Sequence, residues 1–143
     1  MTIVELYPIH AKIIAKLHKD SFDENWTAKA FADLIGLPAS FGFIMMQEDE
    51  PVGFILCQGD ECESEIITIS TNPSARRQGI ARNLLNAALK KTEKIFLEVA
   101  KDNSIARLFY TEAGFSKVGV RKNYYKRADN STIDAIVMEK MRN

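Results

Sequence analysis

The apolar residues of this chain recur with two different periods, and each stretch of one period predicts one element. Two β-prone runs at 41–47 and 52–58 are joined by the polar turn 48–51, which predicts a hairpin. An acidic, turn-like segment at 61–65 leads into an apolar run at 66–71, which we expect to form the central strand. These residues together predict a meander of antiparallel strands.

Helices are predicted where apolar residues recur about every 3.6 positions. One helix follows Pro8, and a second is capped by Thr27. A third begins at Ile80, and a fourth follows the cap residues 102–104, with Tyr110 on or beside its apolar face. The expected apolar faces are, in chain order, Ile9, Ile13, Ile14 and Leu17; Ala30, Phe31, Leu34 and Ile35; Ile80, Leu84, Leu85, Ala88 and Leu89; and Ile105, Leu108, Phe109 and Ala113.

The remaining strands complete a mixed sheet. Alternation predicts a first strand at 2–7 and a later strand at 115–120. Apolar runs predict a buried strand at 95–99 and a last strand at 133–138, and the polar residues 121–130 are expected to form a loop. Antiparallel strands that enter a strand–helix–strand unit predict an α+β fold, with a mixed, mostly antiparallel sheet flanked by helices.

Composition limits the classes of protein that the chain can represent. Its 143 residues, 46% of them hydrophobic, suffice for one domain with a core, so we expect a single domain over 1–143. Nineteen basic and nineteen acidic residues give a formal charge of zero, which offers no overall field for nucleic acid or a membrane surface. No apolar run approaches about 18 residues and no cationic start is typical of a signal peptide, which predicts a cytoplasmic protein.

The cysteines and histidines do not have the spacing of a metal site. Cys57 and Cys62 are separated by four residues and have no second ligand pair, so we expect neither a zinc site nor a disulfide framework. We interpret the first as a strand residue and the second as a loop residue. His10 and His18 have no acidic or cysteine partner in register, and we expect them at the surface or the margin of the core.

A basic, glycine-bearing loop runs directly into the helix that begins at Ile80. The first turn of a helix carries backbone N–H groups without an intrahelical partner, together with partial positive charge, and so binds anions. Gly79 allows an anion to approach the backbone closely, and Arg76, Arg77 and Arg82 add formal charge. The alternative is an ordinary solvated helix start, since the loop has neither the Walker pattern nor the G-x-G-x-x-G fingerprint.

The pattern R-x-x-G-x-A at 76–81 resembles the pyrophosphate loop of the GNAT acyl-CoA N-acyltransferases. Further segments follow in the order and spacing of that superfamily, namely Phe96-Leu97-Glu98-Val99, Asn103, Leu108-Phe109-Tyr110 and Ala113-Gly114-Phe115. The match covers the chain from about Val52 onward. With the run RKNYY at 121–125, these segments also resemble the bacterial ribosomal-protein alanine N-acetyltransferases.

The resemblance implies that the chain binds acetyl-CoA. The pantetheine arm would lie along the backbone of Ile69, Ser70 and Thr71, as an added strand does. Asn103 would contact the pantetheine or adenosine side, although it serves equally well as a helix cap. The diphosphate would rest on the loop and the first helical turn, formed by Arg76, Arg77, Gln78, Gly79, Ile80, Ala81 and Arg82.

The resemblance also implies a base and an acid. Transfer of an acetyl group from a thioester requires a neutral amine and a proton for the departing thiolate. Glu98, a carboxylate within an apolar strand, is the candidate base, acting directly or through water. Tyr110 is the candidate acid. The alternative interpretation is an edge-strand carboxylate and a packing aromatic.

The acceptor side is expected to hold a protein or peptide N-terminus. In the resembled family the region 21–26 faces the acceptor, and Trp26, Tyr124 and Tyr125 are the residues that we expect to hold it. Trp26 could equally join two helices. Three residues depart from the family pattern on this side, namely Asn25, Ala100 and Lys126.

Three functions remain open at this point. The first is N-terminal acetylation of a protein such as an alanine-starting small-subunit ribosomal protein. The second is acetylation of a small amine such as a polyamine, an amino acid or an antibiotic. The third is a non-catalytic acetyl-CoA-binding module, which would have no need of both an acid and a base.

A basic cluster is interpreted as a solvated loop rather than an RNA contact, and consists of Arg121, Lys122, Lys126 and Arg127.

Overall fold

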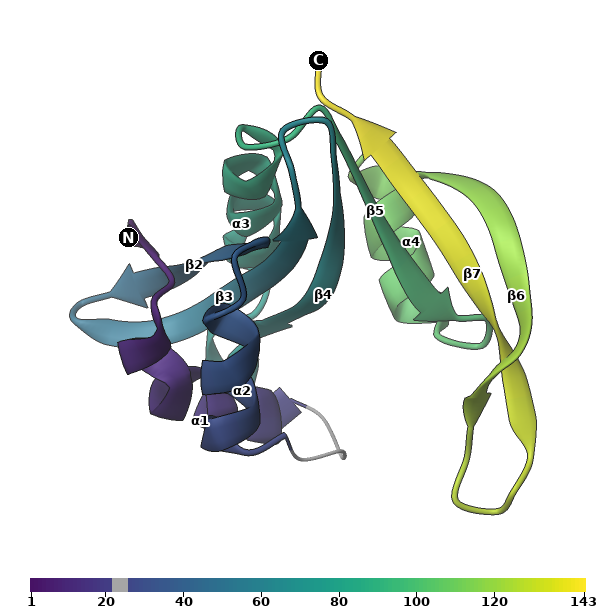
Figure 1. The fold of residues 1–143 in the computed structure, drawn as a ribbon, viewed down its shortest axis with the longest axis horizontal. Helices are drawn as coiled ribbons and strands as arrows, with labels where there is room; N and C mark the ends of the chain where they lie inside the picture. The colour runs from purple at the N-terminus through teal and green to yellow at the C-terminus, as the bar shows by residue number, and fades with distance from the viewer. Residues whose placement is uncertain (22–25) are drawn as a thin grey trace.

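A computed structural model of the chain describes residues 1–21 and 26–143. The strands are β1 Thr2–Glu5, β2 Ser40–Gln47, β3 Glu50–Gly59, β4 Glu63–Thr71, β5 Lys94–Ala100, β6 Ser116–Lys126 and β7 Thr132–Met141. The helices are α1 Ala11–Ser21, α2 Ala28–Ile35, α3 Ile80–Leu89 and α4 Ser104–Glu112, with short 3-10 turns at Pro8–His10 and Pro73–Ala75. The strands form one sheet in the order β1-β2-β3-β4-β5-β7-β6 (Figure 1). Since β4 and β5 are parallel and the other neighbours are antiparallel, the predicted mixed sheet is confirmed.

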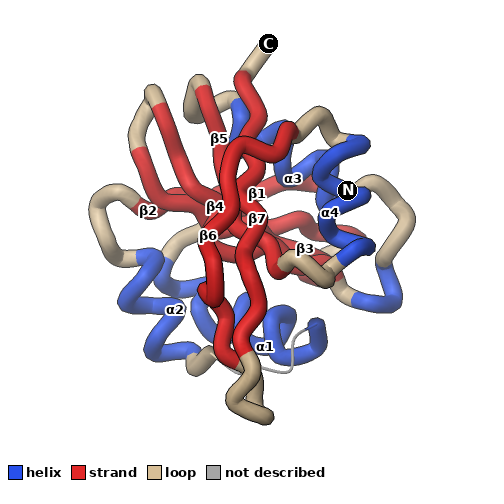
Figure 2. Tube along the Cα trace, turned by 90° about the vertical axis from the view of Figure 1, so that its right-hand side faces the viewer, coloured by secondary structure: helices blue, strands red, loops and turns tan. Residues whose placement is uncertain are grey.

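Two pairs of helices cover opposite faces of this sheet (Figure 2). α1 and α2 bury Ile14 and Phe31 against Phe54 of β3. α3 buries Leu84 on the other face, against Ile55 of the same strand. Successive side chains of a strand point to opposite faces, so a strand covered on both sides is apolar throughout. This explains why β3 has a continuous apolar run instead of an alternating one.

The sheet opens between β4 and β5. The two strands pair over three residues, 63–65 opposite 94–96, and then separate (Figure 1). On its other side β4 carries a bulge, because Ile66 lies opposite Cys57 and Thr68 lies opposite Leu56, which leaves Ile67 as an extra residue. A bulge increases the local twist of a strand. The widening gap between the two strands therefore begins next to the bulge.

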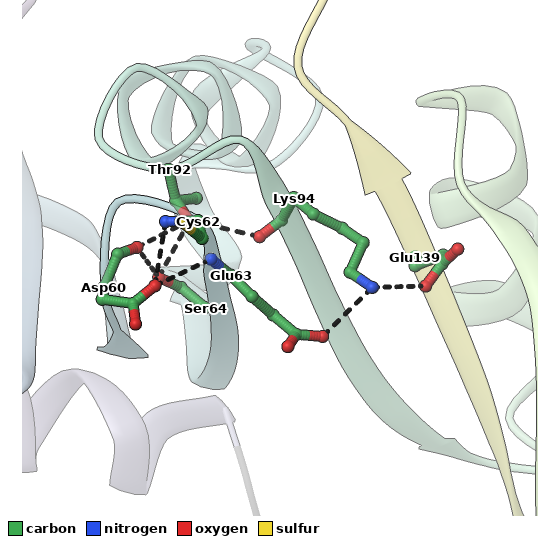
Figure 3. Close-up of polar contacts among 7 residues, drawn as sticks. All are labelled: Asp60, Cys62, Glu63, Ser64, Thr92, Lys94 and Glu139. Atoms are coloured by element: carbon green, nitrogen blue, oxygen red, sulfur yellow. Dashed lines mark hydrogen bonds and ion pairs between the residues drawn. The ribbon is translucent and has the colours of Figure 1, made fainter.

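A polar cluster closes the narrow end of this gap (Figure 3). Lys94 of β5 lies 3.2 Å from the carboxylate of Glu63 on β4 and 3.5 Å from that of Glu139 on β7. The hydroxyl of Thr92, which is fully buried, donates to the backbone oxygen of Asp60 at 2.9 Å. The cluster thus joins the turn before β4 to the segment before β5, and it ties three strands together where the gap begins.

Several predicted elements are confirmed with their local chemistry. The turn between β2 and β3 has Glu48 and Asp49 at φ 51° and 66°, as a two-residue hairpin turn requires. Thr27 caps α2 by accepting from the backbone N–H of Ala30 at 3.0 Å. The face of α3 is buried as predicted, with Ile80, Leu84, Leu85, Ala88 and Leu89 in the core.

The predicted face of α1 is wrong in part. Ile9 is 85% exposed, because it belongs to the 3-10 turn and precedes the α-helix that begins at Ala11. Ile13 is 38% exposed, and the buried positions include Ala11 and His18 instead. His18 is thus a core residue, and it stacks on Trp26 with ring centroids 5.0 Å apart. In α2, Ala30 is exposed.

The predicted face of α4 is also wrong in part. Ile105 is 86% exposed and Leu108 is 60% exposed. The other predicted residues do face the core: Ala113, the cap of α4, is buried, Phe109 packs against the core, and Tyr110 packs on Phe115 with ring centroids 5.3 Å apart. Because the amphipathic pattern contains two adjacent large residues, it is compatible with two rotations of the helix about its axis. Aromatic packing selects the rotation that is observed.

The predicted loop 121–130 is shorter than expected, since β6 continues to Lys126. The five residues of β6 from Arg121 to Tyr125 lie opposite three residues of β7, Ile133 to Ala135, which leaves two extra residues on β6. The extra residues are held by side chains, because the N–H of Asn123 donates to Asp134 Oδ1 at 2.9 Å. A polar strand with such a bulge lacks regular alternation, which is the reason that its sequence resembles a loop. The acidic segment before β4 likewise belongs in part to the strand, which begins at Glu63.

Candidate active site

Two clefts lie along the gap in the sheet. The first, which we call the loop cleft, has a volume of about 580 Å³. It is lined by Ile69, Ser70, Thr71, Arg76, Arg77, Gly79, Ile80, Ala81, Arg82, Asn103, Ile105, Ala106, Phe109 and Tyr110. The second, the splay cleft, has a volume of about 430 Å³. It is lined by Ile66, Ile67, Thr68, Ile69, Leu97, Glu98, Val99, Ala100, Asn103, Ala106, Tyr110 and Tyr125.

The two clefts meet at four residues that line both, namely Ile69, Asn103, Ala106 and Tyr110. These residues come from β4 and from the start and middle of α4, on the two sides of the gap between β4 and β5. The splay cleft is lined from both faces of β5, since Leu97 belongs to the core while its neighbour Glu98 points to the opposite face. A molecule in the loop cleft can therefore meet, through the gap in the sheet, a molecule that enters from the other face.

The loop before α3 has the geometry of an anion site. Gly79 at φ 77° and Arg77 at φ 68° turn the chain into the helix, whose first N–H groups then face the loop cleft. Arg76 and Arg82 line the same cleft, and the ion pairs in the described part of the chain do not involve these arginines. Gln78 is turned away, since its amide oxygen accepts from Gln47 Nε2 at 2.9 Å.

The predicted pantetheine residues lie beside this loop. Ile69, Ser70 and Thr71 line the loop cleft, at the edge of β4 that faces the gap. The hydroxyl of Ser70 donates to the backbone oxygen of Leu17 in α1 at 3.3 Å. Asn103 caps α4 by accepting from the N–H of Ala106 at 3.1 Å, and it also lines both clefts. Its two interpretations, helix cap and cleft residue, are therefore compatible.

Tyr110 lies where the clefts meet and is 8% exposed. Its ring packs between Phe109 and Phe115, each with centroids 5.3 Å away. Burial, with a smaller contribution from Cys57, raises the pKa of Tyr110 to about 12. The phenol therefore keeps its proton at neutral pH, which is the form that an acid needs. Burial also raises the pKa of the Cys57 thiol, so this cysteine behaves as a core residue.

Glu98 lines the splay cleft, with a side chain that is only 9% exposed. Arg121 of β6 places its Nε 2.9 Å from Oε1 of this carboxylate. A hydrogen bond to Glu98 raises the pKa of Tyr124, and the hydroxyl of Tyr125 donates to the backbone oxygen of Glu98 at 3.3 Å. The nearly buried carboxylate is thus compensated by one cation and held by two neighbouring tyrosines.

The sequence pattern of the acetyltransferase (GNAT) family matches residues 11–115. The chain belongs to this family. A [ribosomal protein bS18]-alanine N-acetyltransferase of Escherichia coli K12 is 31% identical over 118 residues, which cover 79% of this chain and 78% of the relative. The crystal structure of the ribosomal-protein-S18-alanine N-acetyltransferase from Escherichia coli has a TM-score of 0.88 at 26% identity and covers 99% and 94% of the two chains. A spermidine/spermine N-acetyltransferase from Vibrio cholerae shares the fold, with a TM-score of 0.77 at 22% identity over 99% and 92% of the chains.

The GNAT acetyltransferase brings two of its three predicted acceptor residues together. Tyr125 lines the splay cleft and Tyr124 lies beside it on β6, 49% exposed. Trp26 packs on His18 and on Phe31, and it is absent from the described lining of both clefts. The structure thus supports its interpretation as a residue that joins two helices, and its role toward an acceptor stays a prediction. Residues 22–25 of the expected acceptor region lie outside the described residues.

Two charged residues of the site were not expected from the sequence. Arg121 was expected in a solvated basic loop, yet it pairs with Glu98. Glu65 of β4 lies near the same pair, since burial, and then the charge of Glu98, raise its pKa while Arg121 lowers it. Position in the sequence gave no sign of either contact, because each joins residues that are far apart in the chain. The ion pair of Arg127 with Asp102, at 2.7 Å, is exposed and lies outside both clefts.

The described residues contain no group of three histidine, cysteine, aspartate or glutamate side chains that could hold a metal ion. Nor does any helix among them have the length and apolar character needed to span a bilayer.

Proposed function

We propose that this acetyltransferase transfers the acetyl group of acetyl-CoA to the N-terminal α-amine of a protein that begins with alanine, such as a ribosomal protein of the small subunit. The observation that carries the proposal is the meeting of the two clefts at Tyr110, with Glu98 in the splay cleft. One cleft can hold the acyl donor while the other admits an amine. The Escherichia coli relative named for alanine acetylation, 31% identical, supports the choice of acceptor.

Acetyl-CoA would occupy the loop cleft. The loop 76–79 and the first turn of α3 would hold its diphosphate through backbone N–H groups, with Arg76, Arg77 and Arg82 supplying charge. The pantetheine arm would follow the edge of β4 along 69–71, as a peptide follows the edge of a sheet. This path leads the thioester from the loop to the place where the two clefts meet.

The reaction would then proceed by direct attack. An α-amine has a pKa of about 7.7 to 8.0, so most of it carries an additional proton at neutral pH. Glu98 would take this proton, directly or through water, and the neutral amine would attack the thioester carbonyl carbon. The carbon–nitrogen bond forms, the carbon–sulfur bond breaks, and Tyr110 would give its proton to the departing thiolate. The new amide nitrogen would release its extra proton to water, and Tyr110 would regain a proton from water. Holding both reactants across the gap would supply much of the rate.

The first test measures CoA release with matched acceptors. We expect release with short peptides that begin with Ala, and none with the same peptides blocked at the N-terminus. Release with polyamines alone would overturn the choice of acceptor while retaining the donor site. If no acceptor leads to CoA release although the protein binds acetyl-CoA, the result would favour a non-catalytic module.

The second test isolates the base. We expect Glu98→Gln to lower kcat by about 10²- to 10³-fold, since general-base catalysis contributes on this order. The dissociation constant of acetyl-CoA should stay unchanged, because Glu98 does not line the loop cleft. Unchanged turnover in this variant would remove Glu98 from the mechanism.

A further inference from the structure

Arg121 reaches Glu98 across an intervening strand. In the register of the sheet, Arg121 lies opposite Ala135 on β7, and Ala135 lies opposite Ala100 on β5. Residues directly opposite each other share a face of the sheet, so these three form one row. Gly119, Val137 and Glu98 form the adjacent row. The arginine side chain therefore runs diagonally over β7 to its partner.

Small residues leave room on the sheet for the arginine side chain. Ala135 is completely buried although α1 and α2 cover a different part of the sheet, which agrees with coverage by the arginine stem. A Cβ atom at Gly119 would meet only Val137, at 3.9 Å, so this position leaves open space beside the stem. Residues of three strands therefore contribute to the pairing of Arg121 with Glu98, which is more than an isolated surface contact.

The bulge in β6 adds a second contact to the same carboxylate. In a regular strand, Tyr124 and Tyr125 would point to opposite faces. Here Asn123 has φ 55°, its N–H donates to Asp134, and its side chain accepts from Thr132 Oγ1 at 2.9 Å. With this irregular backbone, both tyrosines bond to Glu98, one at its side chain and one at its backbone oxygen.

We propose that Arg121 is a positioning residue that holds the Glu98 carboxylate in one orientation, the one from which it can take the proton of the acceptor amine. This inference rests on the proposed role of Glu98 as the base. The groups that face Glu98 are Glu65 from β4 and Arg121, Tyr124 and Tyr125 from β6. On β7, Val137 lies opposite Glu98, and Glu139, the next residue on that face, pairs with Lys94. Arg121 thus lies between two carboxylates. Without this cation, the repulsion between the carboxylates of Glu65 and Glu98 would push the Glu98 side chain out of its present orientation.

The test compares Arg121→Met with Arg121→Lys and with Lys117→Met. Lys117 is an exposed cation on the same strand, outside both clefts, and it controls for the loss of one positive charge. In Arg121→Met we expect kcat to fall about tenfold while KM for acetyl-CoA stays unchanged, because the carboxylate is no longer held in place and Arg121 does not line the loop cleft. Arg121→Lys should restore only part of kcat, because an ammonium lacks the planar fork that orients a carboxylate. Lys117→Met should have the parent kcat and KM.

A second measurement does not depend on activity. The carboxyl carbon of Glu98, followed by NMR with labelled glutamate at one fixed pH, should change its chemical shift in Arg121→Met and keep the parent value in Lys117→Met. This readout separates the present inference from the choice of acceptor: if peptides prove not to be substrates, the chemical shift still tests the ion pair. If Arg121→Met folds poorly, Arg121→Lys takes its place, because it should change the chemical shift and kcat in the same direction by a smaller amount.

Two results would overturn the inference. The first is an unchanged chemical shift of the Glu98 carboxyl carbon together with an unchanged kcat in Arg121→Met. The second is an unchanged kcat with a lower KM for the acceptor, which would mean that Arg121 merely occupies the place of the acceptor amine.

Discussion

Glu98 lies between two core residues in the sequence and outside the core in space. Leu97 and Val99 are buried beneath α3 and α4, whereas the carboxylate points to the other face of β5. The period of two in a strand separates them. A charge in an apolar run is thus explained by the open gap beside β5, which lets one face of the strand line a cleft.

Tyr110 gives a prediction about stability. The phenol ionises near pH 10 in an unfolded chain, whereas burial raises its pKa to about 12 in the folded protein. The phenol keeps its proton to higher pH in the folded state than in the unfolded state. This group therefore contributes stability below pH 10 that is lost as the pH rises toward 12. We expect Tyr110→Phe to remove this loss, which amounts to about 1.4 kcal/mol by pH 11 relative to neutral pH.

Urea unfolding of the parent and of Tyr110→Phe, at several pH values from 9 to about 11, measures the difference between their free energies of unfolding. The other tyrosines and the lysines titrate in both proteins and cancel in the comparison. Parallel pH dependence in the two proteins would show that the phenol ionises as readily in the folded state as in the unfolded one.

At the scale of elements, the loop before α3 depends on backbone conformation more than on side chains. Gly79 adopts φ 77°, in the left-handed region, and a Cβ atom there would meet nothing within 4 Å. A larger residue would therefore be disfavoured by the backbone angle and not by a clash. This makes the position a clean test of loop geometry.

We expect Gly79→Ala to lower the free energy of unfolding by about 1 kcal/mol, since alanine in this conformation is strained. Gly79→Asn should cost less, because asparagine tolerates the left-handed region. The dissociation constant of acetyl-CoA should rise in the same order if the loop backbone holds the diphosphate. Calorimetric titration measures it, and equal affinities in all three proteins would contradict this role of the loop.

At the scale of the whole molecule, the gap between β4 and β5 organises the site. The polar cluster around Thr92 and Lys94 closes this gap at one end (Figure 3). The hydroxyl of Thr92 donates to the backbone oxygen of Asp60 and accepts from Ser64 at 3.1 Å, and Thr92 and Ser64 are both buried. The ion pairs of Lys94 are partly exposed to solvent. Solvent screening weakens exposed ion pairs, whereas a buried hydrogen bond lost from one side leaves its partner unsatisfied.

We therefore expect Thr92→Val to lower the free energy of unfolding by about 1 to 3 kcal/mol. Lys94→Met, the matched change at the exposed side of the same cluster, should have a smaller effect. Denaturant unfolding of both variants measures the two losses. A larger loss in Lys94→Met would mean that the ion pairs, and not the buried hydroxyls, hold the closed end of the gap.

Local signals in the sequence were sufficient for most elements. Apolar period, turn residues and caps predicted the β2–β3 hairpin, the cap of α2 and the buried face of α3, because each depends on neighbours within a few positions. The same signals failed where packing decides between equivalent rotations, as in α4, or where side chains replace a regular ladder, as around Asn123 in β6.

The sequence by itself determined the family, the mixed sheet and the loop before α3, since these follow from contiguous residues. Only the tertiary structure decided how the site is assembled. Tyr110 faces the gap because α4 turns its aromatic side to the sheet, and Arg121 meets Glu98 because three strands place them diagonally across β7. Such contacts join residues far apart in the chain, and strand order and register, which no local pattern encodes, determine them.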